Sequence, residues 1–250
     1  VFREHGEAAY RRYSEDRLDD PLQPGVAFPF VRRILGLNRL APDPDDRLVE
    51  VIVLSRNSPE TGMRVMRSVA HHGLSISRVV FTEGQAPYDF IPAFNMALFL
   101  SADEASVREA AERGLPAGQV VGQARKDDDE SDEVRIAFDF DGVLASDESE
   151  RIFQEDGLDR FHAHEAANCA VPLSPGPLHR LLVAIHRIQQ IEVERAAADP
   201  SHERLLQVAL VTARGAPAHE RAIATLKSWG VKVNDAFFLG GVEKAPILAA

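Results

Sequence analysis

The sequence has 250 residues, and its 45% hydrophobic content can build the core of one large domain or two ordinary ones. A formal net charge of −11 argues against non-specific binding to nucleic acid or to an anionic membrane, because both are polyanions that repel a negative protein. The single cysteine, Cys169, has no internal disulfide partner, and no run of about 18 apolar residues predicts a membrane span. We therefore expect a cytoplasmic protein, with a further segment upstream of Val1 because the chain does not start at methionine.

Apolar runs alternate with turn residues along the first half of the chain. Residues 49–55 (VEVIVLS) form a continuous β-rich run, which is typical of a strand buried on both faces of a parallel sheet. Ser58, followed by a proline, predicts the start of a helix, and Gly73 predicts its end. A capping box formed by Ser101 and Glu104 predicts the start of a later helix.

The second half of the chain has the same alternation after an acidic stretch. Residues 126–133 (KDDDESDE) predict a solvated linker. Strands are predicted at 134–140 and 206–212, and between them the pattern is helical from 148 to about 168 before it breaks at PLSPGP. Strands that alternate with helices predict an α/β fold with parallel sheets.

Two ungapped comparisons of the chain with itself predict that it contains two related units. A shift of 151 positions aligns residues 2–25 with 153–176 and gives seven identities in 24 positions. A shift of 157 positions aligns residues 51–84 with 208–241, with five identities in 34 positions and the same order of strand, turn, helix and strand. The alternative is a chance similarity between two ordinary strand-helix-strand units.

Two carboxylates, Asp139 and Asp141, stand at the end of the strand predicted at 134–140. In open α/β sheets, ligands bind at the carboxyl ends of the strands. Carboxylates this close raise each other's proton affinity unless a cation lies between them, and Mg²⁺, which prefers oxygen ligands, is the expected ion. The alternative is an ordinary strand-ending turn, since aspartate and the following Gly142 are common turn residues.

Further polar residues follow at strand ends in the same half of the chain. Thr212 ends the predicted strand 206–212, so its hydroxyl and the N–H groups of Ala213 and Arg214 can hold a phosphate oxygen. Lys244 offers a compact positive charge for a phosphoryl group and for a nearby carboxylate. Each feature alone is common, but together with the paired acids they predict a site for phosphate chemistry.

The order of these motifs resembles the haloacid dehalogenase-like (HAD-like) phosphohydrolase superfamily. More narrowly, the segments FDFDGVLASDESERIF, GLDRFHAHE, PLSPGPL, LVTAR and LKSWG resemble the cytosolic 5'-nucleotidase I family. The segments NSPETGMRV, HHGL, PGVAF and LFLSAD extend the resemblance through the first half, so it covers nearly the whole chain. It implies two tandem Rossmann-like (HAD-like) parallel-sheet units, with a small helical cap inserted in the second.

The resemblance also implies a division of the chain into parts. Residues 1–125 are expected to be a degenerate, non-catalytic repeat, 126–133 an acidic linker, and 134–250 the catalytic unit. The cap is expected at about 148–176, where it would exclude water and contact the nucleoside. The family's final acidic pair, which completes its metal site, is expected to fall beyond Ala250, so we expect the catalytic unit to continue there.

Catalytic roles follow from the resemblance at the matching positions. Asp139 is implied as the nucleophile that forms an aspartyl-phosphate, and Asp141 as the acid that protonates the departing nucleoside 5'-oxygen and then activates water. Thr212 and Lys244 are implied to bind the transferring phosphoryl group. Mg²⁺ would be held by the Asp139 carboxylate and the Asp141 main-chain carbonyl. The implied substrate is a nucleoside 5'-monophosphate such as AMP or IMP.

The residues next to the predicted catalytic turn are candidates to contact substrate or to orient the cap. They are Ser146, Asp147 and Glu148, in addition to Ala213 and Arg214. The alternative for the first three is that they are exposed residues capping the next helix. Two other functions stay open: a HAD-type phosphatase acting on another small phosphomonoester, and a nucleotide-binding protein without catalysis.

Overall fold

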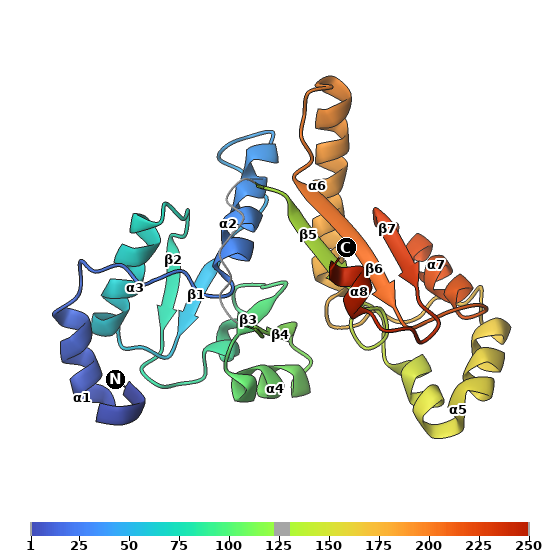
Figure 1. Ribbon diagram of the computed structural model, residues 1–250, viewed down its shortest axis with the longest axis horizontal. Coiled ribbons are helices and arrows are strands. Elements are labelled where there is room, and N and C mark those ends of the chain that lie inside the picture. The colour runs from blue at the N-terminus through green and yellow to red at the C-terminus, as the bar shows by residue number, and fades with distance from the viewer. Residues whose placement is uncertain (1, 123–130, 250) are drawn as a thin grey trace. The chain divides into compact units, whose positions relative to one another are not determined.

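The computed structural model describes residues 2–122 and 131–249, and the chain divides into two compact units, Val1–Asp132 and Glu133–Ala250 (Figure 1). Within the described residues, eight α-helices and three parallel sheets form a mixed α/β structure, which confirms the predicted fold class at that level. Most of the acidic stretch predicted as a linker, residues 126–130, lies outside the described residues.

The first part of unit 1 is a strand-helix-strand element. Strands β1 (Ile52–Ser55) and β2 (Arg78–Phe81) pair in parallel and are joined by α3 (Pro59–His71). Ser58 caps α3, since its Oγ accepts a hydrogen bond from the Thr61 N–H, which confirms the predicted helix start. Three further helices precede β1: α1 (Phe2–Glu15), α2 (Phe28–Gly36) and the 3-10 helix η1 (Leu37–Leu40). Of these, α1 packs against α3.

The second part of unit 1 contains a separate two-stranded sheet. Strand β3 (Phe99–Ser101) pairs in parallel with β4 (Ala117–Gln119), and α4 (Glu104–Glu112) connects them. The 3-10 helix η2 (Pro87–Phe90) precedes β3. The core of this second part of unit 1 consists of Tyr88, Ile91, Phe99 and Ala110.

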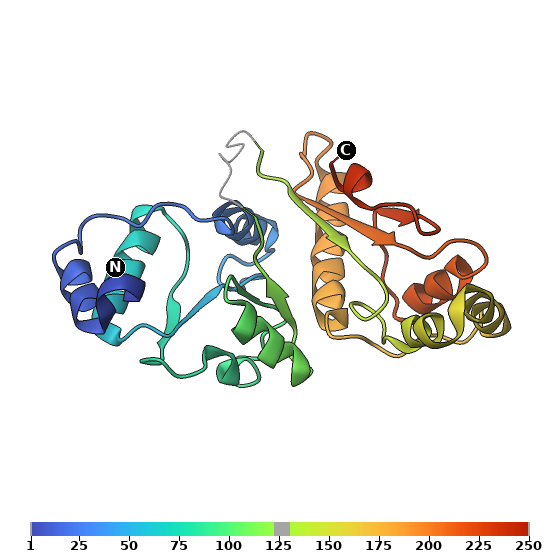
Figure 2. The same ribbon diagram turned by 60° about the horizontal axis from the view of Figure 1, so that its bottom comes forward.

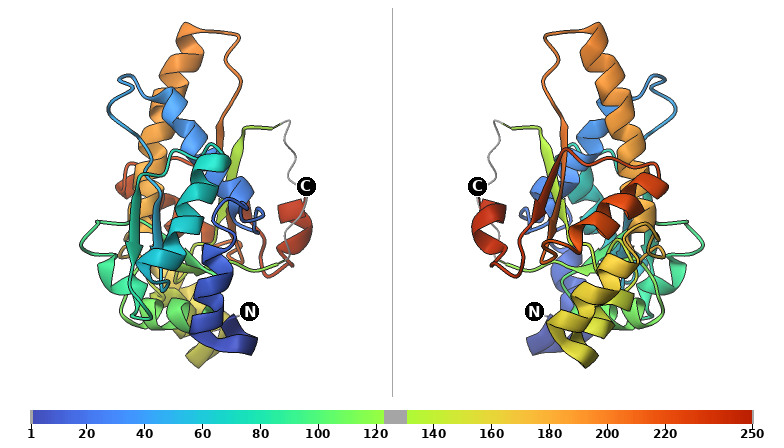
Figure 3. Two further views of the ribbon diagram at one scale, coloured as in Figure 1. Left: turned by 90° about the vertical axis from the view of Figure 1, so that its left-hand side faces the viewer. Right: turned by 90° about the vertical axis from the view of Figure 1, so that its right-hand side faces the viewer.

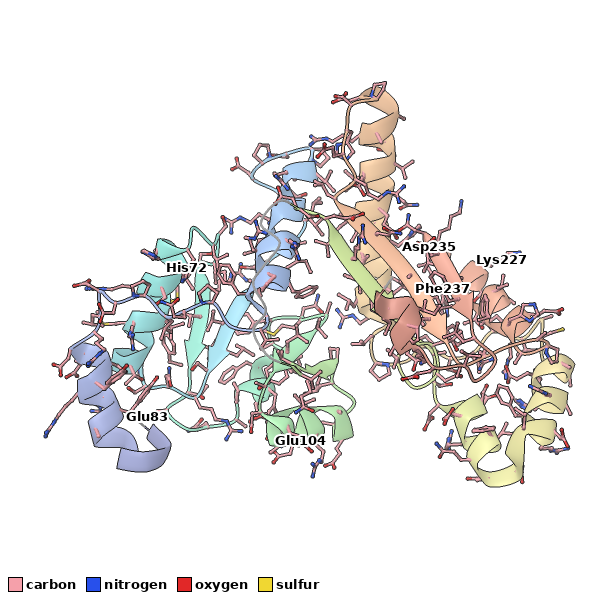
Figure 4. All side chains as sticks on the ribbon, viewed as in Figure 1. His72, Glu83, Glu104, Lys227, Asp235 and Phe237 are labelled. Atoms are coloured by element: carbon pink, nitrogen blue, oxygen red, sulfur yellow. The ribbon has the colours of Figure 1, made fainter. Side chains whose placement is uncertain are left out.

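The capping box predicted at the start of α4 is wrong. Asp103 is the N-cap, and its Oδ2 accepts a hydrogen bond from the Ser106 N–H at 3.2 Å. Ser101 instead ends β3, where it pairs with Gln119, and Glu104 is the first residue of the helix (labelled in Figure 4). Serine and aspartate cap helices about equally well, so the strand pairing decides which of them does so here.

Unit 2 is built on one parallel sheet whose strand order is β5-β6-β7. Strand β6 (Leu206–Thr212) is central and largely buried, and it lies between β5 (Val134–Phe138) and β7 (Asp235–Phe238). Four helices complete the unit: α5 (Glu148–Ala167), α6 (His179–Ala198), α7 (His219–Ser228) and α8 (Ala245–Ala249). Helix α5 lies beside α7, as Figure 2 shows, and α6 is a single unbroken helix (Figure 3).

The strand-helix-strand elements of the two units share one register under the 157-residue shift. Ile52 lies opposite Arg78 in unit 1, and Ala209 lies opposite Asp235 in unit 2. The turns that follow β2 and β7 also agree. The left-handed residues Glu83 (φ 47°) and Gly84 (φ 91°) in unit 1 match Gly240 (φ 57°) and Gly241 (φ 88°) in unit 2 (Glu83 is labelled in Figure 4).

The 151-residue shift relates helix α1 of unit 1 to helix α5 of unit 2 in the same way. Helix α1 is interrupted at Gly6 (φ 77°, ψ −178°) and α5 at Gly157 (φ 81°, ψ −178°). In unit 1 the Leu22 N–H donates to Ser68 Oγ at 2.9 Å, and in unit 2 the Leu173 N–H donates to Thr225 Oγ1 at 3.1 Å. Equivalent positions can therefore be compared residue by residue.

The equivalent glycines Gly25 and Gly176 differ in their surroundings, which predicts a difference in stability between their alanine variants. An added Cβ at Gly176 would lie 2.4 Å from the Ala145 carbonyl oxygen and 2.7 Å from that of Val143, whereas at Gly25 it would meet nothing within 4 Å. We expect Gly176→Ala to lower the free energy of unfolding by about 1–3 kcal/mol, because the backbone must move to relieve the clash. Gly25→Ala, the matched control, should change it by less than about 0.5 kcal/mol. Urea unfolding of both variants measures the difference, and equal midpoints would contradict the packing described.

Candidate active site

The carboxyl ends of the strands in unit 2 bring predicted site residues to one edge of the sheet. Asp139 directly follows β5, and Thr212 is the last residue of β6. Because the strands are parallel and in register, their carboxyl ends lie at the same edge (Figure 1). Thr212 is buried, and its Oγ1 accepts a hydrogen bond from the Arg214 N–H at 3.2 Å.

Lys244 lies directly against Asp139. Its Nζ is 2.6 Å from Asp139 Oδ2, while Asp139 Oδ1 accepts a hydrogen bond from the Phe140 N–H at 2.8 Å. The side chains are 32% and 44% exposed, so solvent or a ligand can reach both groups. The turn of left-handed glycines after β7 directs the chain toward Lys244, and it packs closely on the loop after β6, since a Cβ at Gly215 would lie 2.9 Å from Gly240 Cα.

The Asp141 carboxylate is held by Arg214. The Arg214 Nε donates to Asp141 Oδ2 at 2.8 Å and its Nη2 donates to Oδ1 at 2.6 Å, which is a bidentate pair. The third nitrogen, Nη1, donates to Glu165 Oε2 and to the Ala218 carbonyl. Arg214 is only 1% exposed, so its guanidinium is fully used within the protein, and its predicted contact with substrate stays a prediction.

Glu165 joins Arg214 to a second arginine. Its Oε1 accepts hydrogen bonds from Arg221 Nη1 and from Ser149 Oγ, both at 2.8 Å. Arg221 Nη2 in turn donates to Glu148 Oε1 at 3.1 Å. Glu165 is completely buried and Arg221 nearly so. The result is a chain of alternating charges that runs from the turn after β5 to both ends of α5.

The ionic contacts shift two pKa values. Burial acts to raise the pKa of Glu165, but the Arg214 charge and the hydrogen bonds from Ser149, Arg214 and Arg221 outweigh it, so the pKa lies below its ordinary 4.5. Burial acts to lower the pKa of Arg214, and the hydrogen bond and charge of Asp141, then Glu165, more than reverse this, so that pKa is raised. Both groups are therefore charged at neutral pH.

Sequence reasoning missed Glu165 and Arg221 as members of the site. Both are far from the paired acids along the chain. Arg221 lies outside the segments that carry the resemblance, and Glu165 is the last residue of one of them, GLDRFHAHE, but no local pattern links either residue to the paired acids. A signal was nevertheless present in the internal alignment. Glu165 and Arg214 replace two uncharged residues of the first unit, Ser14 and Asn57.

The remaining predicted residues surround the turn that follows Asp141. The Ser146 hydroxyl is buried, and within the described part of the chain it has no hydrogen-bond partner. Asp147 occupies the N-cap position of α5 without a capping hydrogen bond, and its Oδ1 lies 3.4 Å from Arg151 Nε. Glu148 contacts Arg221, and Ala213 is exposed at the end of β6.

The oxygen donors at the turn after β5 are of the type that a hard dication prefers. Asp139 offers a partly exposed carboxylate, now paired with Lys244, and Asp141 offers a main-chain carbonyl. The described residues contain no group of three or more His, Cys, Asp or Glu side chains that could hold a metal ion. Two protein oxygens are compatible with Mg²⁺, because this ion usually keeps several waters and binds through one or two carboxylates plus substrate phosphate.

The lowered pKa of Glu165 predicts a pH dependence of stability. Ionised Glu165 stabilises the folded state above about pH 4.5, and this contribution is lost as the pH falls through the lower folded pKa. We expect Glu165→Gln to be less stable than the unmodified protein at pH 7, with the difference shrinking below pH 4.5. Thermal unfolding from pH 7 to pH 3 tests this, with the exposed Glu220→Gln as control. A difference that stays constant over this range would contradict it.

Carboxylates, a hydroxyl and an ammonium group lie at the carboxyl edge of a parallel sheet, where ligands bind in α/β folds, and groups of these kinds can position and stabilise a phosphoryl group. A sequence model of the family described as 5'-nucleotidase matches residues 1–250. The chain therefore belongs to the 5'-nucleotidase family.

A human protein, cytosolic 5'-nucleotidase 1B, is 34% identical over 256 residues. The alignment covers 99% of this chain and 41% of the human protein, so the chain spans less than half the length of that relative. The comparison with solved structures gives no significant match. In the described part of the chain, every helix is too short or too polar to cross a membrane.

Proposed function

We propose that the protein hydrolyses nucleoside 5'-monophosphates, with AMP or IMP as substrate, to nucleoside and phosphate through an aspartyl-phosphate on Asp139. The observation that carries the proposal is the contact of Lys244 Nζ with Asp139 Oδ2 at 2.6 Å. Asp139 stands two residues before Asp141, the proposed acid. An ammonium beside a partly exposed carboxylate suits a nucleophile that must approach a phosphate dianion. Membership in the 5'-nucleotidase family supports the same reaction.

Each proposed catalytic residue has a distinct task. An Asp139 oxygen bonds to phosphorus while the bond to the nucleoside 5'-oxygen breaks, and Asp141 gives that oxygen a proton. Asp141 then takes a proton from the water that attacks the aspartyl-phosphate and releases phosphate. The Lys244 ammonium, the Thr212 hydroxyl and the Ala213 N–H hold the phosphoryl oxygens, where alignment and charge stabilisation supply most of the rate.

The proposed cofactor is Mg²⁺, held by the Asp139 carboxylate and the Asp141 main-chain carbonyl. When bound, the ion would neutralise charge on the phosphate oxygens as the nucleophile approaches. These oxygen donors support a hard cation over a thiophilic one.

Residues 148–176 are proposed to act as the cap that covers the nucleoside and excludes water. Ser146, Asp147 and Glu148 would contact the substrate or orient the cap. Among the described residues the buried Ser146 hydroxyl has no hydrogen-bond partner, which supports this, because an unsatisfied polar group of this kind is costly unless a ligand or water meets it.

We also propose that the chain consists of two tandem HAD-like units, a non-catalytic repeat at 1–125 and a catalytic unit at 134–250. The shared strand register and the matched turns support the repeat. Ser55 stands at the position of Thr212, and Pro87 at that of Lys244, so the first unit has no ammonium there. A cytoplasmic location is proposed as well, and the name of the human relative supports it.

A phosphate-release assay on the full-length protein tests the proposal. AMP, IMP and other nucleoside 5'-monophosphates are compared with sugar phosphates, each with Mg²⁺ and with EDTA. Preference for the nucleotides, lost in EDTA, is the expected result. Preference for a sugar phosphate would favour a phosphatase on another phosphomonoester, and nucleotide binding without release would favour a non-catalytic protein. Either outcome overturns the proposed function.

A further inference from the structure

The buried pair of Arg214 and Glu165 has no charged counterpart in unit 1. Asn57 stands at the position of Arg214 under the 157-residue shift, and Ser14 stands at that of Glu165 under the 151-residue shift. Ser14 is 2% exposed, so the equivalent site in unit 1 is buried as well. Unit 1 therefore has a buried polar position where unit 2 has a buried ion pair.

The framework around the two positions is nevertheless the same. Arg221 Nε donates to the Val171 carbonyl at 2.9 Å, and its counterpart Arg64 Nε donates to the Asp20 carbonyl at 3.0 Å. The hydroxyls of Thr225 and Ser68 donate to the carbonyls of these two arginines, both at 2.7 Å. Equivalent aromatic pairs stack edge to face next to this framework: His179 with Trp229, and Phe28 with His72.

This local fold therefore forms without the ion pair. Buried ion pairs add little net stability, because desolvation of both charges offsets their attraction. Removing one partner is costly, whereas replacing both with residues that suit the site can be neutral. Since the fold does not require Arg214 and Glu165, their presence beside Asp141 calls for another explanation.

We propose that Arg214 is a positioning residue for the leaving-group proton, and that Glu165 holds Arg214 in place. This rests on the proposed function, in which Asp141 is the acid. The bidentate contact fixes the plane of the Asp141 carboxylate, since Arg214 Nε and Nη2 hold its two oxygens at 2.8 and 2.6 Å. Each carboxylate oxygen has a second lone pair, which remains available to carry the proton. In this role the Arg214 side chain acts through Asp141 rather than on the substrate.

Glu165 gives the positioning a rigid base. It contacts Arg214 Nη1 from the side opposite Asp141 and is itself held by Arg221 and Ser149 at 2.8 Å. Ser149 and Glu165 lie near the two ends of α5. The orientation of Asp141 is thus coupled to the seating of the helix that is proposed to cover the nucleoside.

Two variants test the positioning role, so that the test does not depend on the folding of a single variant. Arg214→Lys keeps the charge but cannot make the bidentate contact. The double variant Arg214→Asn with Glu165→Ser introduces the pair found in unit 1, and circular dichroism should show that it folds. For both, we expect kcat on AMP to fall about 10- to 100-fold, because misplacing a catalytic group by about 1 Å costs this much. KM for AMP should change little.

A second substrate distinguishes positioning from a structural role. p-Nitrophenyl phosphate has a leaving group that departs without a proton, so in both variants the burst of p-nitrophenol that reports the first step should slow far less than AMP hydrolysis does. Arg187→Lys, at an exposed position of α6, is the matched control and should behave as the unmodified protein. A burst that slows as much as AMP hydrolysis does, or an unchanged kcat on AMP, would overturn the inference. An unmodified protein that releases phosphate from neither substrate would instead remove the proposed function, and the inference with it.

Discussion

Asp139→Asn is expected to lower phosphate release from nucleotides by more than about 10³-fold, because an amide is too weak a nucleophile to form the phosphoryl-enzyme. Folding should be nearly unaffected. The pair with Lys244 is partly exposed on both sides, and such pairs contribute at most about 1 kcal/mol. Steady-state phosphate release and thermal unfolding of the variant measure the two effects separately.

A matched control and a trapping experiment sharpen this prediction. Asp235→Asn changes the same residue type at the amino end of β7, the edge of the sheet away from the site, and should retain activity (Asp235 is labelled in Figure 4). Beryllium fluoride, a phosphoryl mimic, should raise the unfolding temperature of the unmodified protein and of Asp235→Asn but not of Asp139→Asn. Activity of Asp139→Asn near the unmodified level would exclude the covalent mechanism.

Asp141→Asn is expected to slow AMP hydrolysis by about 10²–10⁴-fold, the usual contribution of a general acid-base group. An asparagine cannot deliver a proton to the 5'-oxygen, and it cannot take one from the attacking water. Formation of the aspartyl-phosphate from p-nitrophenyl phosphate needs no such proton. Its first step, seen as a burst of p-nitrophenol, should therefore remain fast in the variant.

The measurement is rapid-mixing kinetics on both substrates, with Asp235→Asn as control again. In Asp141→Asn the burst should be followed by slow turnover, because the second step still requires water to be activated. If the burst slows as much as AMP hydrolysis does, Asp141 does not act on the leaving group. The Arg214 variants should share the direction of this pattern with a smaller amplitude, since they leave the carboxylate in place.

The elements that carry a strong local signal could be predicted from the sequence. The apolar run ending at Thr212 forms strand β6. In unit 1, Ser58 caps α3, the helix that follows β1. The paired acids at Asp139 and Asp141 follow a strand as expected. In each case neighbouring residues alone determine the structure, through periodicity, capping or turn chemistry.

The contacts that depend on the tertiary fold could not be predicted in this way. Whether Ser101 or Asp103 caps α4 depends on how far β3 pairs with β4, which the local sequence does not encode. The contact of Arg214 with Glu165 joins residues from different elements, and charged side chains of this kind are usually exposed. Only the comparison of the two units shows that these positions differ in charge within a shared framework.

The interruption of α5 at Gly157 limits how the proposed cap can move. The segment before the glycine contacts Arg221 through Glu148 and Glu165 through Ser149. The segment after it contacts Arg214 and Arg221 through Glu165, so both segments share Arg221 and Glu165. Phe153 and Leu158 are 44% and 54% exposed near the bend. Because α5 is attached at both ends, the proposed cap cannot open as a rigid body. Bases of different size would have to be accommodated by bending of α5 at Gly157.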